Sequence, residues 1–580
     1  MGGFFKFLLR TRIRFNLTGW RGIYFYAVLA GVISAAVASC FQFATHSILA
    51  LLTGTDGERV VASFAAIPAL RRIFSLCVGA VLAGIVLVFA AKKIRKAPTP
   101  YMEAVSIGNG YIPVRSNLLR SLAAILTIGS GASIGREGPL VQTVTVFASI
   151  FGRKLNFSPP RLRLIVACSA AGAMAAVFHA PMAGALFVCE IVVGIMSIDI
   201  IAPLLVSSCT SYLIVSILGN SSPLYEISAA YLSINARTAI LSLILGVIAS
   251  VCAKGWLVML VKCRSLLNRS VVFLPFRLAL AGVIVGTIAI YYPEVTGNGA
   301  HIIRGIVSMN FSLEQISTLF ALKVFSVVLF FGLGAVGGVL TPTLTVGGIL
   351  GFIFAQTLVA LGIPLGTEEI IGFSLLGMAA FFTTAAAAPL TSLMLVLEFT
   401  MAGRMIYPLI IGVLVSYGIS KLMRTKSMYA SAVSSGFKSV FDKPLCDVSV
   451  NSLARRGDNT VFATTLFADI AKIFLKNPDY AVYVVTRSNK YIGAVLRSDV
   501  LEFVKSGALS SKVIADDIMR ADVPPIFAET SLVDAIKAFS ETSAEELPMI
   551  DGSGRFKGIV NRNDIFMAFN EISVRDKLGR

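Results

Sequence analysis

Glu137 is the residue whose position most directly predicts chemistry, since it is an acid in an apolar stretch where a helix is expected to begin. It belongs to the run from Gly135 to Pro139, and proline is favoured in the first turn of a helix because its missing N–H is not needed there. The free N–H groups of that turn form a site for an anion. A carboxylate held only by the helix dipole is the structural alternative. Because an ionisable side chain at membrane depth is costly, we expect Glu137 to mark an ion pathway.

Membrane helices are the elements that must position Glu137. The 580-residue chain is 56% hydrophobic and 14% charged, unlike an average soluble protein, and its mean hydropathy is +0.82. Runs without charge, such as Tyr24 to Gly54 and Ile73 to Ala91, approach or exceed the ~20 residues of a spanning helix. The run from Val324 to Thr367 is too long for one helix, and its glycine–proline break predicts discontinuous helices at membrane depth.

Composition also excludes several classes of function. The net charge of +19 comes from short basic runs between apolar spans, which is typical of loops facing the cytoplasmic leaflet rather than of a nucleic-acid-binding surface. The eight cysteines form no C-x-x-C pair and the three histidines lack metal-ligand spacing, so we predict no metal site. The sequence shows no nucleophile–base pair, and we do not expect an enzyme.

An internal repeat relates the two halves of the apolar part. The segments Pro181 to Glu190 and Pro389 to Glu398 have the same spacing from proline to glutamate, and each follows a glycine–proline turn, Gly135 to Pro139 or Gly338 to Pro342. Two such halves in the same order indicate a repeat-built transporter. We therefore predict a polytopic all-α membrane domain of two related halves with broken helices over residues 21–440, after a cytoplasmic N-terminal segment of residues 1–20.

The tail, over residues 441–575, has the composition of a small α/β domain. The pattern from Tyr491 to Asp499 returns from Phe556 to Asp564, each time as a strand that leads toward an aspartate. The repeat of roughly 60 residues indicates a tandem pair of small modules.

These motifs resemble those of the CLC chloride channels and chloride/proton exchangers. The likeness extends from about Tyr24 to Ser435, and three marks carry it in order: Gly135 to Pro139, Gly338 to Pro342, and Tyr429 near the end of the membrane part. The tail from about Lys443 to Asn570 resembles a pair of CBS domains, a frequent cytoplasmic addition to CLC proteins.

The resemblance implies a homodimer in the cell membrane, with both termini cytoplasmic and one pathway for chloride or another small anion in each subunit. Glu137 would be a gating glutamate that competes with the anion for one desolvated site. Backbone N–H groups after Gly338 would bind the anion without a full positive charge, which keeps release fast, and a tyrosine hydroxyl would donate from the inner side. The implied anion-binding residues are Arg136, Gly138, Val339, Leu340 and Tyr429.

One departure from the family pattern concerns the anion. Most members carry a serine in a glycine–proline turn about forty residues before the gating glutamate, and this serine binds the central anion. Spacing places that turn at Ala97 to Pro100, which lacks serine. The pattern from Gly108 to Pro113 is the other candidate, but it is too close to Glu137, and we favour the first placement. A fluoride-selective transporter is therefore an alternative, although such members usually lack CBS tails.

A second departure concerns protons. Many exchangers have a proton-carrying glutamate directly after the helix glutamate, which is Glu190 here. That position is Ile191, which cannot carry a proton. This slightly favours a passive channel over a chloride/proton antiporter, which stays open because some members couple to protons without that residue.

The tail also departs from the pattern of its family, the CBS domains. Nucleotide sites in CBS domains often have Ser or Thr three residues before the aspartate that binds the ribose, and here Leu496 precedes Asp499 and Asn561 precedes Asp564. The two aspartates predict an adenine nucleotide site, against a purely structural dimer contact. No other cofactor is expected. A membrane-anchored nucleotide sensor is the alternative from another functional class.

The gating role of Glu137 leads to a first prediction. Glu137→Gln should mimic the protonated carboxyl group, because the amide is neutral and similar in shape, so anion flux should lose most of its pH dependence. The measurement is anion efflux from reconstituted liposomes over a range of pH. A variant that keeps the wild-type pH profile would exclude Glu137 as the gate.

Overall fold

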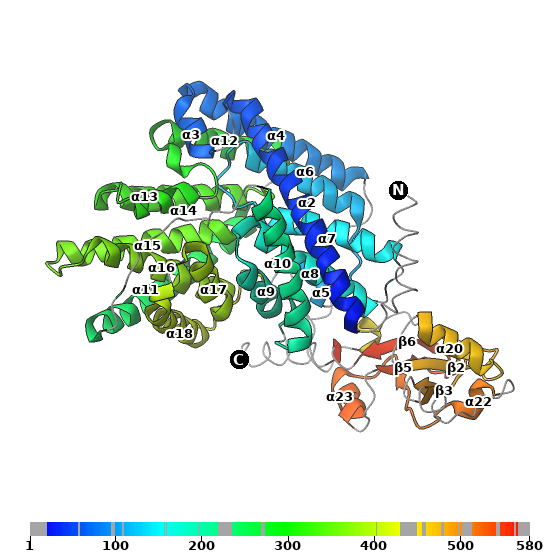
Figure 1. The fold of residues 1–580 in the computed structure, drawn as a ribbon. Helices are drawn as coiled ribbons and strands as arrows, with labels where there is room; N and C mark the ends of the chain where they lie inside the picture. The colour runs from blue at the N-terminus through cyan, green and yellow to red at the C-terminus, as the bar shows by residue number, and fades with distance from the viewer. Residues whose placement is uncertain are drawn as a thin grey trace. The chain divides into compact units, whose positions relative to one another are not determined.

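The computed structural model describes residues 20–55, 59–93, 99–106, 109–155, 157, 159–194, 196–218, 232, 235–267, 273–401, 403–429, 449–454, 460–476, 481–496, 499–500, 513–540, 546–561 and 564–565. The chain divides into two compact units, Met1–Val433 and Ser434–Arg580. The first is helical and the second contains the strands (Figure 1).

The helices of the first unit form two successive series. The first series is α2 (Trp20–Thr53), α3 (Val60–Ala66), α4 (Ala69–Lys93), α5 (Tyr101–Ser106), α6 (Val114–Gly129), α7 (Glu137–Lys154), α8 (Pro159–Phe178), α9 (Pro181–Phe187), the π-helix η1 (Val188–Val193) and α10 (Ile198–Ile217). The second is α11 (Ala236–Leu267), α12 (Leu274–Tyr291), η2 (Pro293–Val295), α13 (Ala300–Val307), α14 (Leu313–Gly332), α15 (Leu340–Ala360), α16 (Thr367–Ala386), α17 (Pro389–Thr400), η3 (Gly403–Met405) and α18 (Ile406–Leu422).

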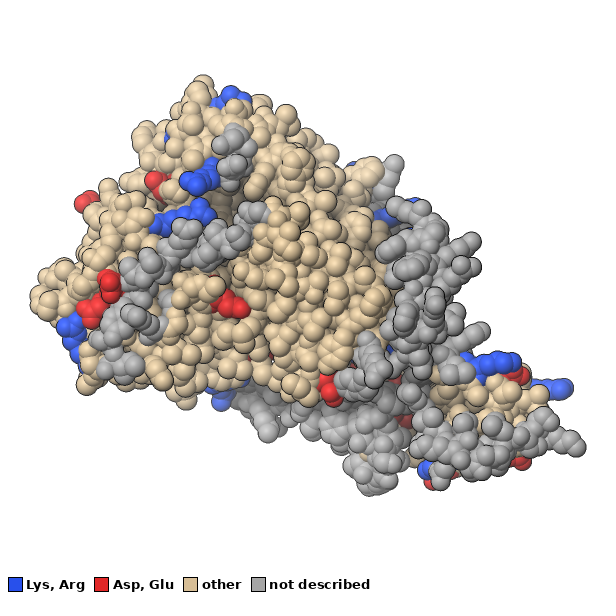
Figure 2. Space-filling view, in the orientation of Figure 1, with Lys and Arg blue, Asp and Glu red and all other residues tan. Residues whose placement is uncertain are grey.

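Nine of the helices in the described residues are long and apolar enough to cross a membrane. The visible face of this unit is built largely of uncharged residues (Figure 2), and large apolar side chains such as Phe43, Leu70 and Phe276 are exposed on its surface. A surface of this kind suits lipid rather than water. The predicted polytopic membrane domain is confirmed.

The predicted breaks occur, and they have the same form in both halves. The charge-free run after Val324 is divided between α14 and α15. The helices α8 and α16 each end in a non-glycine residue with left-handed backbone, His179 at φ 56° and Ala387 at φ 58°, directly before an Ala-Pro pair that starts the next helix. Such residues are uncommon in this region. The repeat read from the sequence is therefore also a repeat of backbone geometry.

Each half also caps a helix of the other half with a glutamate. Glu190 accepts hydrogen bonds from the backbone N–H groups of Leu390 and Thr391, at 3.2 and 2.8 Å, at the start of α17. Glu398 accepts from those of Met182 and Ala183, at 2.9 and 2.7 Å, at the start of α9. The first N–H groups of a helix lack partners within the helix and favour negative charge. The repeated glutamate thus joins α9 to α17 twice.

A buried lysine fixes a turn in the second half. Lys323 of α14 has no exposed surface, and its Nζ donates to the carbonyl oxygens of Val295 and Gly297 at 2.9 and 2.7 Å. The N–H of Gly297 donates in turn to the carbonyl oxygen of Gly131 at 2.9 Å. Gly131 belongs to the segment between α6 and α7, so this lysine connects α14 to the chain that leads into Glu137.

The tail consists of two similar units, as the sequence predicts. Their elements are η5 (Val450–Ser452), β1 (Thr460–Phe462), α20 (Phe467–Lys476), β2 (Ala481–Val485), β3 (Tyr491–Leu496), α22 (Ala515–Ile518), β4 (Ile526–Phe527), α23 (Leu532–Ser540), β5 (Glu546–Ile550) and β6 (Phe556–Asn561). The sheet orders are β1-β2-β3 and β4-β5-β6, with the first pair parallel and the second antiparallel in each. The repeat predicted from Tyr491 and Phe556 is confirmed.

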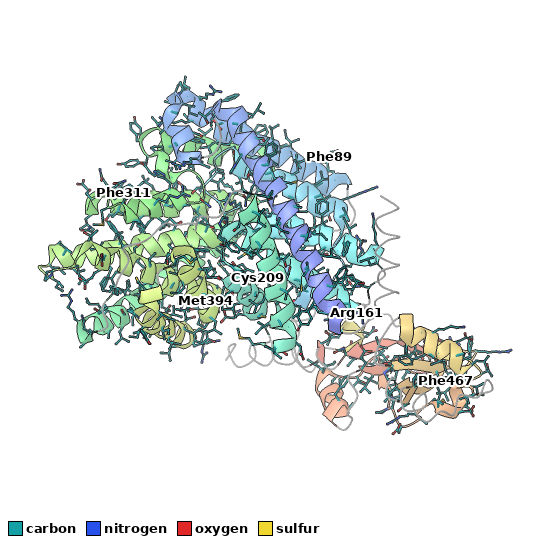
Figure 3. The ribbon with its side chains drawn as sticks, in the orientation of Figure 1. Phe89, Arg161, Cys209, Phe311, Met394 and Phe467 are labelled. Atoms are coloured by element: carbon teal, nitrogen blue, oxygen red, sulfur yellow. The ribbon has the colours of Figure 1, made fainter. Side chains whose placement is uncertain are left out.

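The two units of the tail share a core. The ring of Tyr483 on β2 stacks on that of Phe556 on β6, with centroids 5.3 Å apart, and Lys490 and Arg555 form an antiparallel bridge between the hairpin turns. Phe467, labelled in Figure 3, is buried in the first repeat of the tail with Val482 and Val500. The tail therefore combines a local core with one that requires both repeats.

The contacts of Lys323 lead to a second prediction. Lys323→Met should leave two buried carbonyl oxygens without donors, at about 1–3 kcal/mol each, and lower the stability of the membrane unit. Lys323→Arg retains the positive charge and donors, so it should restore most of that stability. The measurement is thermal unfolding in detergent, with Arg237→Met as a control at a more exposed carbonyl contact. Equal melting temperatures for Lys323→Met and the wild type would contradict the argument.

Candidate functional site

The site lies where α7 and α15 begin, because the two glycine–proline turns meet there. Gly135 and Gly338 form an isolated antiparallel bridge, in which each N–H donates to the other carbonyl oxygen at 2.7 Å. A Cβ added at Gly138 would lie 3.6 Å from the Cα of Gly338. The starts of two helices from different halves of the chain therefore approach each other closely, and both offer free N–H groups.

Glu137 is buried at this meeting point. Its side chain is 2% exposed, and its Oε1 accepts a hydrogen bond from the hydroxyl of Thr341 in the first turn of α15. Its Oε2 is buried without a hydrogen-bond partner among the described residues. A buried, half-satisfied carboxylate is costly and is expected at a functional position rather than in a purely structural one.

The glycines of the bridge provide the space for this carboxylate. A Cβ at Gly135 would lie 2.2 Å from the Oε2 of Glu137, and one at Gly338 would lie 3.0 Å from it. Any larger residue at Gly135 would have to displace the Glu137 side chain or the bridge. The glycine in each turn is therefore explained by the room that one carboxyl group needs.

The predicted backbone donors lie at the same place. Val339 is the N-cap residue of α15 and Leu340 its first residue, and Leu340 is buried. Arg136 is the N-cap residue of α7 and interacts electrostatically with Glu137. Gly138 lies against Gly338. The structure thus gathers four of the five residues predicted to bind the anion around the bridge.

Tyr429 reaches the same neighbourhood from the end of the membrane unit. Its ring packs edge to face on Phe187, at the end of α9, with centroids 5.6 Å apart, and its backbone N–H donates to the Oγ of Ser427 at 3.2 Å. It lies in the vicinity of Glu137 and of Tyr101, the first residue of α5. Residues predicted from three distant motifs are therefore brought together.

The favoured position of the serine-free turn is described only from Thr99 onward. Ala97 and Pro98 lie outside the described residues. The next residues are bound by Gln142 of α7, which accepts from the N–H of Tyr101 at 2.8 Å and donates to the carbonyl oxygen of Thr99 at 3.1 Å. The start of α5 is thus fixed to the helix that carries Glu137, as the favoured placement requires.

The other placement of the serine turn is at the far end of α7. The Oγ of Ser149 donates to the carbonyl oxygen of Gly110 at 2.8 Å and accepts from the N–H of Ile112 at 3.1 Å. Ser149 is twelve residues after Glu137, which corresponds to ~18 Å along a helix. Gly110 and its neighbours are therefore too distant from Glu137 to complete its site.

Thr341 contacts Glu137 directly and is the residue of this site that the sequence did not single out. It stands inside the motif from Gly338 to Pro342, but only the backbone of that motif was assigned a role. The sequence contained a signal for it, because a hydroxyl one residue before the proline lies in the first turn of a helix, where side-chain oxygens and free N–H groups are available for hydrogen bonds.

The position directly after Glu190 carries no titratable side chain. Ile191 lies in the π-helix η1 and packs against the apolar core. Its neighbour Glu190 is engaged with the start of α17. Cys209 of α10, labelled in Figure 3, lies in the vicinity of Glu398, the corresponding acid of the other half. Both repeat glutamates therefore have structural contacts.

In the tail, Asp499 already has a strong partner. Its carboxylate binds the guanidinium of Arg520 through Nε at 3.0 and 3.1 Å and through Nη2 at 2.6 Å, and it also accepts from the N–H of Leu496 at 3.3 Å. Asp564 is buried and makes contacts of its own. A ribose at Asp499 would have to compete with a bidentate arginine, which is among the stronger side-chain pairings.

Comparisons with known proteins agree with this geometry. A family described as "Voltage gated chloride channel" matches residues 78–421, and the CBS domain family matches residues 450–506 and 515–571. A ClcB-like chloride channel protein of Ralstonia nicotianae is 33% identical over 412 residues, covering 70% of this chain and 95% of the relative. A voltage-gated ClC-type chloride channel ClcB of Escherichia coli is 30% identical over 407 residues, covering 70% and 96%.

Solved structures share the fold at lower identity. A slow cyanobacterial Cl⁻/H⁺ antiporter has a TM-score of 0.62 at 19% identity, covering 71% of this chain and 97% of its own. A eukaryotic CLC transporter has a TM-score of 0.63 at 16% identity, covering 93% and 97%. A CLC-type fluoride/proton antiporter has a TM-score of 0.57 at 20% identity, covering 71% and 98%.

Proposed function

The chain belongs to the voltage-gated chloride channel (CLC) family, with two CBS domains in its tail, and we propose that it carries chloride across the membrane past a gate formed by Glu137. The observation that carries the proposal is the buried Glu137 carboxylate between the starts of α7 and α15. A site that holds one desolvated negative group at helix N-termini suits a small anion of the same charge. The ionised carboxylate and the anion exclude each other, because two negative charges cannot share one such site.

Gating then follows from protonation or displacement of one side chain. When Glu137 is protonated or swings out, the N–H groups of Val339 and Leu340 are free to bind the anion. These are partial charges, which bind weakly enough for the anion to leave again. Tyr429 would receive the anion on the inner side. Arg136 and Gly138 complete the outer wall of the pathway in this proposal.

Passive conduction is the mode we propose, and its support is the inner half of the pathway. Ile191 has no titratable group, and Glu190 is bound to two N–H groups of α17. Neither residue is therefore available to transfer a proton. Proton-coupled exchange is the second candidate, because one structure with the same fold is titled as a Cl⁻/H⁺ antiporter.

Fluoride is the alternative substrate, since the turn before Tyr101 has no serine and one structural neighbour is titled as a fluoride/proton antiporter. The CBS tail and the relatives named as chloride channel proteins support chloride instead.

A subunit pair is part of the proposal. Exposed apolar residues such as Leu213, Leu390 and Leu414 on α10, α17 and α18 would be covered by a second copy in this proposal.

A regulatory role for the tail is also proposed, with an adenine nucleotide as ligand at Asp499 or Asp564. The aspartate of the first unit would bind ribose only after Arg520 moves away, so the ion pair between them would set the affinity of that site. Both termini would lie in the cytoplasm, where such nucleotides are present. A role as nucleotide sensor alone is weakened by the gate-like environment of Glu137.

The transport mode leads to a third prediction. Reconstituted protein under a fixed chloride gradient and an added pH gradient should show a reversal potential at the chloride equilibrium value. The reason is that no titratable carrier stands at Ile191. A steady displacement of the potential toward the proton gradient would show coupling and replace the passive mode. Parallel efflux of fluoride and chloride identifies the preferred anion.

The tail leads to a fourth prediction. The full-length protein should bind ATP or AMP in calorimetry, and Asp499→Ala or Asp564→Ala should abolish the affected site. Arg520→Gln should raise the affinity at Asp499, because the competing guanidinium is gone. Lys472→Gln, which alters an exposed i,i+3 ion pair, serves as the control. Absence of heat with every adenine nucleotide would leave the tail a structural role only.

A further inference from the structure

We propose that the hydroxyl of Thr341 is a direct ligand of the transported anion at the position that the Glu137 carboxylate occupies, and that it supplies a side-chain hydroxyl to a pathway whose turn before α5 has no serine. The inference rests on the proposed function, in which Glu137 occupies an anion site. Thr341 donates its hydroxyl hydrogen to the Oε1 of Glu137. A donor that binds the anion mimic in the closed state faces the anion once the mimic has left.

The position of Thr341 suits this role. It is the second residue of α15, is 2% exposed, and lies between Leu340 and Pro342 in the turn that meets Gly135 and Gly138. Its hydroxyl therefore adds a side-chain donor to the N–H groups of the same helix start. An anion within reach of those N–H groups is within reach of this hydroxyl as well.

Other hydroxyl groups of α15 are used differently. Thr343 donates to the carbonyl oxygen of Val339 at 2.6 Å and accepts from the Nε1 of Trp256 at 3.1 Å. Thr345 donates to the carbonyl oxygen of Asn298 at 3.4 Å. Thr341 instead donates across the boundary between the two halves, to the acid of α7. When that acid moves away, the buried hydroxyl would be left without its acceptor, which is unfavourable, so a new acceptor is favoured.

The residues around the serine-free turn are less suitable. Gln142 is occupied by the backbone of Thr99 and Tyr101 and by the Oδ1 of Asn117. Ser133 is buried and its Oγ has no hydrogen-bond partner among the described residues. No contact connects that oxygen to Glu137, whereas Thr341 touches the carboxylate directly. Ser133 is therefore the rival that an experiment must separate from Thr341.

In this proposal the Glu137 carboxylate and the anion compete for one hydrogen-bond donor as well as for the same space. The carboxylate and the anion both need the hydroxyl of Thr341, so each binds less well when the other is present. Thr341 would hold the closed gate and also stabilise the anion after opening. Removal of the hydroxyl should then weaken both states, which a purely structural threonine would not do.

The test isolates anion binding from gating by removing the gate. Chloride affinity is measured by calorimetry on the full-length Glu137→Ala protein and on the same protein with Thr341→Val, Thr341→Ser, Ser133→Ala or Thr345→Val added. We expect Thr341→Val to lower the affinity about tenfold to a hundredfold, the effect of one hydrogen bond to a charged group. Thr341→Ser keeps the hydroxyl and should restore the affinity, and Thr345→Val, one turn further on the same face, should leave it unchanged.

Several outcomes would overturn the proposal. These are unchanged chloride affinity with Thr341→Val, a loss that Thr341→Ser fails to restore, or a loss with Ser133→Ala alone, which would assign the role to Ser133. Failure of the gate is a separate result, because it appears as a wild-type pH profile in Glu137→Gln and does not depend on chloride affinity. Flux at varied pH with Thr341→Val alone completes the set, and it should be shifted relative to the wild type if the hydroxyl also holds the gate.

Discussion

Burial of one carboxylate between two helix starts is the constraint on which the membrane unit depends. Glu137 can stay there only because Gly135 and Gly338 leave it space and because Thr341 satisfies one of its oxygens. Each of these residues belongs to a glycine–proline turn, and each turn belongs to a different half of the chain. The site therefore forms only when the two halves meet. Burial of the Glu137 carboxylate requires both copies of the repeated turn.

The same relation between halves recurs away from the site. Glu190 caps the start of α17 and Glu398 caps the start of α9, so the two halves hold each other through a pair of equivalent contacts. The end of α9 then packs on the ring of Tyr429 through Phe187. The contact of α9 with α17 is thus connected to Tyr429 through packed side chains.

Much of this fold follows from sequence, and the reasons differ by element. Charge-free length identifies membrane helices, and the spacing from Pro181 to Glu190 identifies the repeat. Side-chain partners do not follow in the same way. The contact of Thr341 with Glu137 joins positions about two hundred residues apart, and no local pattern encodes it. The contacts of Lys323 with Val295 and Gly297 were likewise invisible, because a lysine in an apolar run has no sequence signal for carbonyl partners.

Ionisable side chains in the membrane unit, of which Lys323 is buried and three others are partly buried, have the same kind of partner. Glu190 and Glu398 are bound by backbone N–H groups, while Lys323 and Arg277 are bound by backbone carbonyl oxygens. A fully charged partner would bind more strongly and would itself need to be desolvated, at a cost that often exceeds the gain. Backbone dipoles avoid this cost because they are fixed by the fold and carry only partial charge. An ion pathway also needs binding by partial charges, because an anion that is held by backbone dipoles and a hydroxyl can still leave. The backbone groups that stabilise the fixed charges of this fold are therefore of the kind that lets a mobile anion pass.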